Sequence, residues 1–243
     1  MPRQPALPGS TRVLDVAVLL FAFLLPTGGA WLYFVLLSEH RLMQVAYGLS
    51  KIVQFALPIA WVVLVQRRRI VLHRPRARHI AAGLALGLMM VGAGLAAYHG
   101  YFKSSPLLAN AASLVMLRLE GMGLDSPIAY FAFAIFLCAG HSLLEEYYWR
   151  WFVFGQARNL MPVWTAIALS SLGFMAHHVI VVDRLLQAPW LFTVVLSLAV
   201  ALGGVAWAWL YARTGSLIGP WVSHALVDAG LMYIGYDLVW RAS

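Results

Sequence analysis

The sequence predicts an all-α protein, a bundle of about seven membrane-spanning helices with one further helix in the membrane interface. The composition is 62% hydrophobic and 11% charged, with a mean hydropathy of +0.80. A soluble domain is nearer half apolar and a quarter charged, so this composition indicates a membrane protein. The apolar residues also form runs of about 20 residues, the length that crosses a bilayer as a helix.

We expect one integral membrane domain over residues 1–243. Its spans are predicted at Val13–Leu37, Val45–Val65, Ile80–Phe102, Pro127–Phe154, Pro162–Val182, Trp190–Tyr211 and Leu217–Tyr236. The first run follows basic residues, as a signal peptide does, but it is long enough to span and lacks a clear cleavage site. Residues 103–126 mix apolar and polar positions, which predicts an amphipathic stretch in the interface.

The basic residues lie mainly in one loop. The net charge of +8 could indicate a nucleic-acid partner. Six arginines, however, fall between the second and third runs: Arg67, Arg68, Arg69, Arg74, Arg76 and Arg78. This pattern is typical of a cytoplasmic loop beside anionic lipid. We therefore expect the lipid bilayer as a partner, no nucleic acid, and a cytoplasmic N-terminus that includes Arg3.

Three smaller features complete this picture. Only Lys51 and Lys103 among the 17 basic residues are lysines, which favours a GC-rich bacterial source and hence a bacterial cytoplasmic membrane. The single cysteine, Cys138, excludes an internal disulfide and a cysteine-based metal site. Gly83 and Gly87 have a spacing that permits close helix approach.

The stretch from Gly140 to Arg150 carries the first candidate site residues. It places Glu145, Glu146 and Arg150 at the end of an apolar run. Ionisable groups in a span cost roughly 2.5–3.5 kcal/mol each, so they indicate function. Glu146 and Arg150 are four residues apart on one helix face and can form an ion pair, which leaves Glu145 available for another role.

Two later spans carry histidines. In the fifth, Phe174 precedes His178 by four residues, and His177 is rotated by about 100° from that face. In the seventh, His224 and Asp228 are four residues apart on one face. A lone histidine in a span is more often a packing residue. We interpret the three stretches together as a polar constellation between helices.

These motifs resemble those of a known family. Glu145-Glu146-x-x-x-Arg150, Phe174-x-x-x-His178 and His224-x-x-x-Asp228, in this order on three spans, are similar to the motifs of the CPBP family, the CAAX-protease and bacteriocin-processing (Abi) intramembrane endopeptidases. This family includes the Ras-converting CAAX prenyl protease. The resemblance covers roughly residues 127–236 and includes the lead-in from Arg213 to Leu217.

The resemblance implies a role for each motif residue. Glu145 would activate the attacking water as general base, and His178 would share that water. Arg150 would hold Glu146, which shapes the site. His224 and Asp228 would bind the oxyanion of the tetrahedral intermediate, the contact that usually contributes most to such catalysis.

Two points stay open at this stage. An ionised aspartate only accepts hydrogen bonds, so Asp228 is either protonated, orients His224, or ligates a metal. His178, His224 and Glu145 with one water could also hold zinc. We favour a mechanism without a metal cofactor, because no His-Glu-x-x-His signature is present.

The sequence therefore predicts an intramembrane endopeptidase that cleaves a membrane-associated protein or peptide. The alternative is a catalytically silent membrane protein, a transporter or bacteriocin-immunity scaffold, that uses the same polar cluster. Transporters often have inverted repeats and paired broken helices, and we find no such pairing. His141, four residues before Glu145, is interpreted as a packing residue.

Overall fold

The structure is a computed structural model that describes residues 9–37, 42–70, 76–108 and 110–241. It is mainly helical, with no strand among these residues, which confirms the all-α prediction. The longer helices are α1 (Gly9–Trp31), α2 (Met43–Ala60), α3 (Ala77–Gly100), α4 (Ala111–Gly121), α5 (Pro127–Ile135), α8 (Val163–Leu186), α9 (Trp190–Thr214) and α10 (Ile218–Tyr236). Arg3 and Arg74, used above for the orientation, lie outside the described residues.

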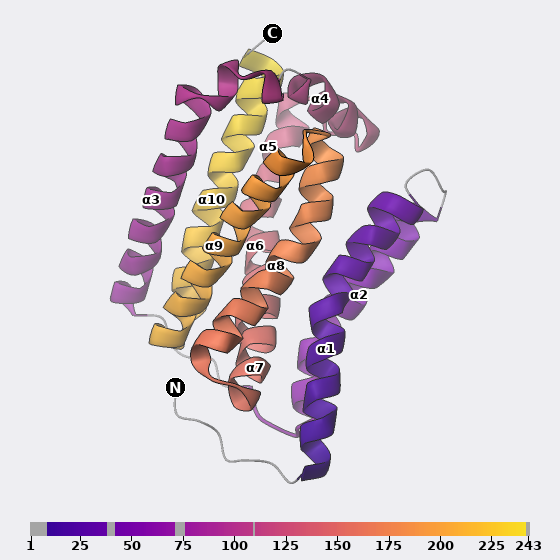
Figure 1. Cartoon of the computed structure of the whole chain (residues 1–243), viewed down its shortest axis with the longest axis vertical. Coiled ribbons are helices and arrows are strands. Elements are labelled where there is room, and N and C mark those ends of the chain that lie inside the picture. Colours follow the sequence, from indigo (N-terminus) through magenta and orange to yellow (C-terminus); the bar gives the residue numbers. More distant parts are fainter. Residues whose placement is uncertain (1–8, 38–41, 71–75, 109, 242–243) are drawn as a thin grey trace. The chain divides into compact units, whose positions relative to one another are not determined.

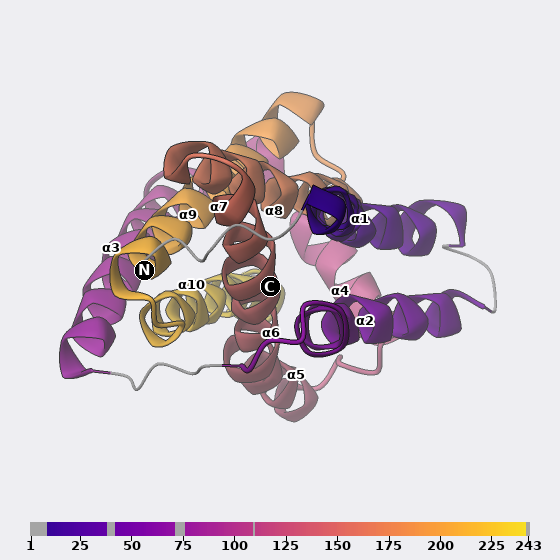
Figure 2. The same ribbon diagram turned by 90° about the horizontal axis from the view of Figure 1, so that it is seen from below.

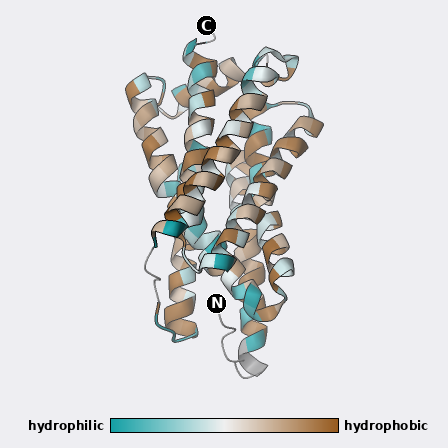
Figure 3. Cartoon of the chain, turned by 90° about the vertical axis from the view of Figure 1, so that its left-hand side faces the viewer, coloured by the Kyte–Doolittle hydropathy of each residue, from teal (hydrophilic) through white to brown (hydrophobic). Residues whose placement is uncertain are grey.

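Six of the described helical stretches are long and apolar enough to cross a membrane. They are Arg12–Leu36, Met43–Val65, Ala77–Ser104, Pro127–Leu160, Val163–Leu186 and Trp190–Thr214. Figure 3 shows hydrophobic residues along most of the helices. The seventh expected span forms α10, which is not among the six, because Ser223, His224 and Asp228 lower its apolar character. The chain is thus a multi-pass membrane protein.

The interfacial stretch is broken into short helices. Two 3-10 turns, Phe102–Ser104 and Pro106–Leu108, precede α4. Tyr98, Ala111 and Leu238 form a small buried core here, against which Phe102 and other apolar residues pack. This core fixes α4 to the ends of α3 and α10.

The helix that carries the first motif is not a uniform α-helix. Between Pro127 and Leu160 it changes twice to the wider π form, at η5 (Phe136–His141) and η6 (Tyr147–Phe154). The α-helical turn α6 (Ser142–Glu146) lies between them, and α7 (Gly155–Leu160) follows. Segments of π-helix are rare in proteins, and where they occur they often lie at functional sites.

The chain divides into two compact units. The first comprises Met1–Arg74, Glu145–Val181 and Ser197–Leu217, and the second comprises Pro75–Leu144, Val182–Leu196 and Ile218–Ser243. Each is assembled from segments far apart in the sequence. The single domain expected above therefore stays a prediction.

In the first unit, α1 and α2 pack beside each other and against the motif helix (Figure 2). The Tyr148 hydroxyl donates to the Ala22 carbonyl at 2.7 Å, and the Tyr147 hydroxyl donates to the Phe55 carbonyl at 3.2 Å. Near the other end of these helices, the Gln66 amide donates to Asp15 at 2.9 Å. The two tyrosine bonds hold the motif helix against α1 and α2, and the Gln66 bond joins α1 to the segment that follows α2.

In the second unit, α3 and α10 pack closely along their lengths (Figure 1). A Cβ at Gly83 would collide with the backbone of Gly219, and one at Gly87 would lie 3.0 Å from the Ser223 Cα. The predicted use of these two glycines for close approach is confirmed. Glycine is needed at both positions because no side chain fits there.

A buried charge joins the far ends of the same two helices. Asp237, directly after α10, accepts hydrogen bonds from the Tyr98 hydroxyl at 2.9 Å and from the Lys103 ammonium at 2.6 Å. The hydrogen bond from Lys103 holds the pKa of the Asp237 carboxyl below its ordinary value of 3.8. These two donors, both bound to Oδ2, favour the ionised form of Asp237.

Candidate active site

The motif helix buries all three charged residues of the first motif. Glu145, Glu146 and Arg150 are 2%, 0% and 1% exposed. Arg150 Nε lies 3.2 Å from Glu146 Oε2, the ion pair expected from their spacing. Because taking two charges out of water is costly, a buried ion pair of this kind is weak evidence for a stabilising role.

The guanidinium of Arg150 lies between aromatic rings. Its Cζ atom is 4.6 Å from the ring centroid of Phe174 and 5.1 Å from that of Trp207. Cation–π contacts of this kind contribute up to about 2 kcal/mol when the cation is desolvated. The contacts bring α8 and α9 to the motif helix, so the second motif's Phe174 serves to place Arg150.

Glu145 contacts a histidine. Its Oε1 lies 3.5 Å from His177 Nε2. The His177 ring is stacked on Trp149 with an interplanar angle of 2° and a centroid separation of 5.7 Å. Since Trp149 is itself fully buried, the orientation of the imidazole beside Glu145 is fixed by packing.

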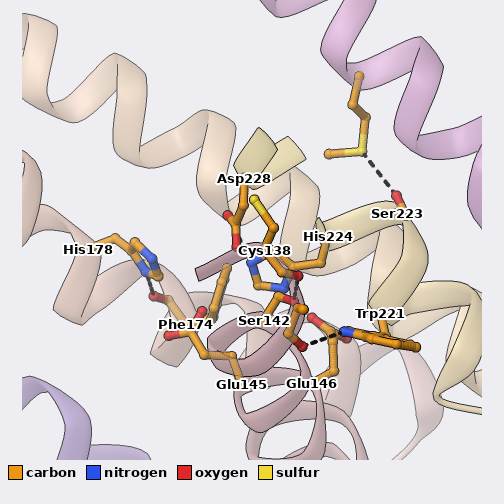
Figure 4. Close-up of polar contacts among 12 residues, drawn as sticks. Cys138, Ser142, Glu145, Glu146, Phe174, His178, Trp221, Ser223, His224 and Asp228 are labelled. Carbon is orange, nitrogen blue, oxygen red and sulfur yellow. Dashed lines mark hydrogen bonds and ion pairs between the residues drawn. The ribbon is translucent and has the colours of Figure 1, made fainter. Parts of the chain in front are cut away.

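His178 is oriented by the backbone of its own helix. Its Nδ1 lies 2.8 Å from the Phe174 carbonyl oxygen and donates to it, since a carbonyl can only accept (Figure 4). In the neutral imidazole this leaves the lone pair on Nε2, where it can accept a proton or bind a metal. The His177 and His178 rings are adjacent, with centroids 4.1 Å apart.

His177 was not among the site residues predicted from the sequence. A helical projection placed it about 100° from the face of Phe174 and His178. The structure shows that an imidazole reaches sideways far enough for both histidines to lie near one carboxylate. The histidine pair in the sequence was the available signal, and it was discounted by considering Cα directions alone.

One group of described residues could hold a metal ion. Donor atoms of Glu145, His177 and His178 lie within 4.8 Å of one another. A carboxylate and two imidazoles with one water fit a catalytic zinc ion, and zinc would supply Lewis-acid activation of that water. The sequence predicted His224 as the third ligand, but this group contains His177 instead. His224 belongs to the second unit.

Close helix contact sets the spacing around His177. A Cβ at Gly173 would lie 2.7 Å from the Phe23 ring and 2.8 Å from Trp149 Cζ3. Only glycine allows α8 to approach α1 and the motif helix so closely. The bare backbone at Gly173 thus positions the histidines that follow one turn later.

A lysine from α2 adds a positive charge near Glu145. Lys51 Nζ donates to Gln54 Oε1 at 3.1 Å and lies 5.6 Å from the ring centroids of Tyr47 and Phe55. Its ammonium and the Glu145 carboxylate attract each other. Lys51 was not predicted as a site residue, although a lysine inside a span is itself a sign of function.

The third motif lies on α10 in the second unit. His224 Nε2 is 3.6 Å from Asp228 Oδ1, and His224 is 4% exposed (Figure 4). In the same unit the Trp221 indole donates to the Ala139 carbonyl at 3.0 Å, which joins α10 to η5, the segment that contains His141. The spacing thus brings His224 and Asp228 together as expected.

Comparison with known proteins gives one match. Residues 127–230 match the family model described as type II CAAX prenyl endopeptidase Rce1-like. This confirms the resemblance predicted from the three motifs, all of which lie within the matched residues. No match was found among the curated proteins or among the solved structures.

The match covers less than half of the chain. The protein is a multi-pass membrane protein, and its residues 127–230 are similar to the CAAX-type prenyl endopeptidases, a family of hydrolases that act on peptide or protein substrates. Residues 1–126, which include Lys51 and α1 to α4, lie outside the match.

Proposed function

We propose that this protein is an intramembrane endopeptidase in which Glu145 activates the attacking water. The observation that supports this most directly is a buried carboxylate, 2% exposed, with His177 at 3.5 Å and His178 in the same group. A carboxylate beside an imidazole in apolar surroundings is a suitable general base. His178, through Nε2, shares the water and receives or returns its proton.

The remaining motif residues have the roles that the family resemblance implies. Glu146, paired with Arg150, shapes the site around Glu145. His224 stabilises the oxyanion of the tetrahedral intermediate, and Asp228 either adds a hydrogen bond as the protonated acid or orients His224. Preorganised donors of this kind typically contribute about 2.7–4 kcal/mol each to catalysis.

The proposed reaction uses no metal cofactor. Glu145 and His178 suffice to take up and return the proton of the water. If zinc is bound instead, Glu145, His177 and His178 are the residues that would hold it. Purified protein should contain no stoichiometric zinc, and chelators should leave its activity unchanged. About one zinc per chain, lost and restored together with activity, would favour the metalloprotease mechanism.

The substrate we propose is a membrane-associated protein or peptide, cut near the lipid boundary. We further propose that the protein lies in a bacterial cytoplasmic membrane with its N-terminus in the cytoplasm. The described arginines between α2 and α3 support this orientation, because cytoplasmic loops are enriched in basic residues.

The decisive experiment replaces the proposed base. Glu145→Gln keeps the shape of the side chain and removes its basicity, so peptide cleavage should fall by about 10²–10⁴-fold. Membrane proteins that accumulate uncut with this variant, identified by mass spectrometry, would reveal the substrate. Glu120→Gln, the same change at an exposed position of α4, is the matched control.

Unchanged processing by folded Glu145→Gln would exclude the general-base role. An absence of any cleavage product that depends on the wild-type chain would favour the alternative, a catalytically silent scaffold.

A further inference from the structure

A pocket of about 240 Å³ lies in the first unit, where α8 begins and α9 ends. Its lining consists of Val163, Trp164, Ile167, Trp209, Ala212 and Arg213. None of these residues belongs to the proposed active site. The pocket contains one cation, two indole rings and apolar side chains, and no acidic residue.

The pocket lies at the end of two membrane spans. Val163 is the first residue of one candidate span, and Arg213 is next to the last residue, Thr214, of another. A site at span ends is level with the lipid headgroups, where tryptophan and arginine are enriched. Lipid is therefore the molecule that this pocket meets at the highest concentration.

The cation is held over an aromatic ring at the pocket. The Arg213 Cζ atom lies 5.5 Å from the ring centroid of Trp209. The helix end is also fixed, because the Thr214 hydroxyl donates to the Leu210 carbonyl at 2.8 Å and Gly215 adopts a positive φ of 67°. A capped last turn keeps the guanidinium at the pocket.

The remaining lining residues give the pocket one polar, exposed side and one apolar, buried side. Trp164 is 65% exposed and can present its indole N–H, whereas Ile167 is 2% exposed. A guanidinium with an indole donor matches a phosphate group, and the apolar side matches the glycerol and first methylenes that follow it. The combination suits an amphipathic phosphate ester better than an inorganic ion.

The size of the pocket supports the same ligand class. Pockets that enclose drug-sized ligands measure about 300–1,000 Å³. A volume of about 240 Å³ accommodates a small group, with the remainder of a larger ligand lying outside. A phospholipid places its headgroup in such a pocket while its acyl chains stay in the bilayer.

We propose that this pocket binds the phosphate-bearing headgroup of an anionic phospholipid. Arg213 binds the phosphate, Trp164 donates its indole N–H, and Ile167 with Val163 contacts the glycerol region. The site lies outside the catalytic residues and does not depend on the proposed activity.

The test measures lipid binding directly. Purified chain in detergent is incubated with equal amounts of phosphatidylglycerol and phosphatidylcholine of identical acyl chains, and the retained lipid is measured by native mass spectrometry. Wild type should retain about fivefold more phosphatidylglycerol, the preference expected of one basic residue at an anionic lipid surface. Arg213→Gln should remove this preference.

Two further variants and one competitor complete the design. Arg158→Gln is the matched control, since Arg158 lies over the Phe154 ring in the same unit and does not line the pocket. Trp164→Leu, at an exposed position, decides the result if Arg213→Gln fails to fold, and should reduce phosphatidylglycerol retention at least twofold. Millimolar inorganic phosphate should displace none of the retained lipid.

Four results would overturn the proposal. These are equal retention of both lipids by wild type, an equal loss in Arg158→Gln and Arg213→Gln, unchanged retention in Trp164→Leu, and displacement of the lipid by inorganic phosphate. The last of these would identify a site for the free anion.

Discussion

Two buried charge clusters, one in each unit, differ in how their hydrogen bonds are satisfied. In the second unit, Asp237 accepts from Lys103 at 2.6 Å and from Tyr98 at 2.9 Å. In the first, Arg150 pairs with Glu146 at 3.2 Å and lies against two aromatic rings, and its guanidinium donates no hydrogen bond of good geometry to any residue that the structure describes.

The difference indicates what each cluster is for. A buried charge that accepts hydrogen bonds from fixed donors, as Asp237 does, stabilises a fold. A buried charge held mainly by ring faces keeps its hydrogen-bonding capacity at a cost in stability, which proteins accept mainly at functional sites. This criterion favours a structural role for the Asp237 cluster and supports our proposal that the Arg150 cluster forms part of the active site.

The largest effect is expected at Arg150. Arg150→Met leaves Glu146 buried without its counter-charge and should lower the free energy of unfolding by about 3–5 kcal/mol. Unfolding in mixed micelles of fixed composition measures this. The double variant Glu146→Gln/Arg150→Met should recover much of the loss while cleavage stays absent. Equal destabilisation of the single and double variants would show that lost packing, rather than charge, dominates.

The next effect concerns the histidine beside Glu145. His177→Gln loses the stacking on Trp149 that fixes the contact to Glu145, so kcat/KM should fall about tenfold with little change in stability. His99→Gln, at a histidine of the second unit whose ring lies near the Tyr233 ring, is the control and should leave kcat/KM unchanged. If the fraction of folded protein falls by as much as kcat/KM does, His177 contributes through packing alone.

The Asp237 cluster should affect stability and its pH dependence. Lys103→Met should cost about 1–2 kcal/mol, a modest value because the Lys103 side chain is 37% exposed. A carboxyl group whose pKa is lowered by folding adds stability above its unfolded value, and this stability is lost as pH falls through the folded value. Wild type should therefore lose stability below about pH 4, and Lys103→Met should lose less over the same range.

The smallest effect is expected at position 228, on α10. Asp228→Asn replaces an ionisable acceptor with a permanent donor, so a pH–rate profile should show activity within a few-fold of wild type and no loss at high pH. A fall of about 10²-fold at every pH would assign Asp228 to orienting His224 or to a metal. Such a result would exclude the oxyanion contact at this position.

Much of the architecture was predictable because it follows from local sequence. Apolar runs fixed the spans, and four-residue spacings placed Glu146 beside Arg150 and His224 beside Asp228. Gly83 and Gly87 marked the close approach of α3 to α10. In each case the partners are encoded by short-range periodicity or by the absence of a side chain.

The remaining features depend on tertiary contact. His177 was missed because the directions of Cα–Cβ bonds do not give the reach of a ring. Asp237 and Lys103 are separated by 134 residues, and no local pattern connects them. The π-helical segments η5 and η6 were also not predicted, because a helical projection assumes the same rotation for every residue. The role of Lys51 depends on α2 packing beside the motif helix.

The close contact at Gly173 determines how the proposed site responds to bilayers of different thickness. Backbone there rests on the Phe23 and Trp149 rings, and close-packed contacts of this kind are nearly incompressible. A change in acyl-chain length or lateral pressure can alter the tilt of the spans at small cost. The gap between Glu145 and His177, however, is set by rigid spacers within the protein. Changes in bilayer thickness or lateral pressure should therefore leave the distance between Glu145, the proposed base, and His177 unchanged.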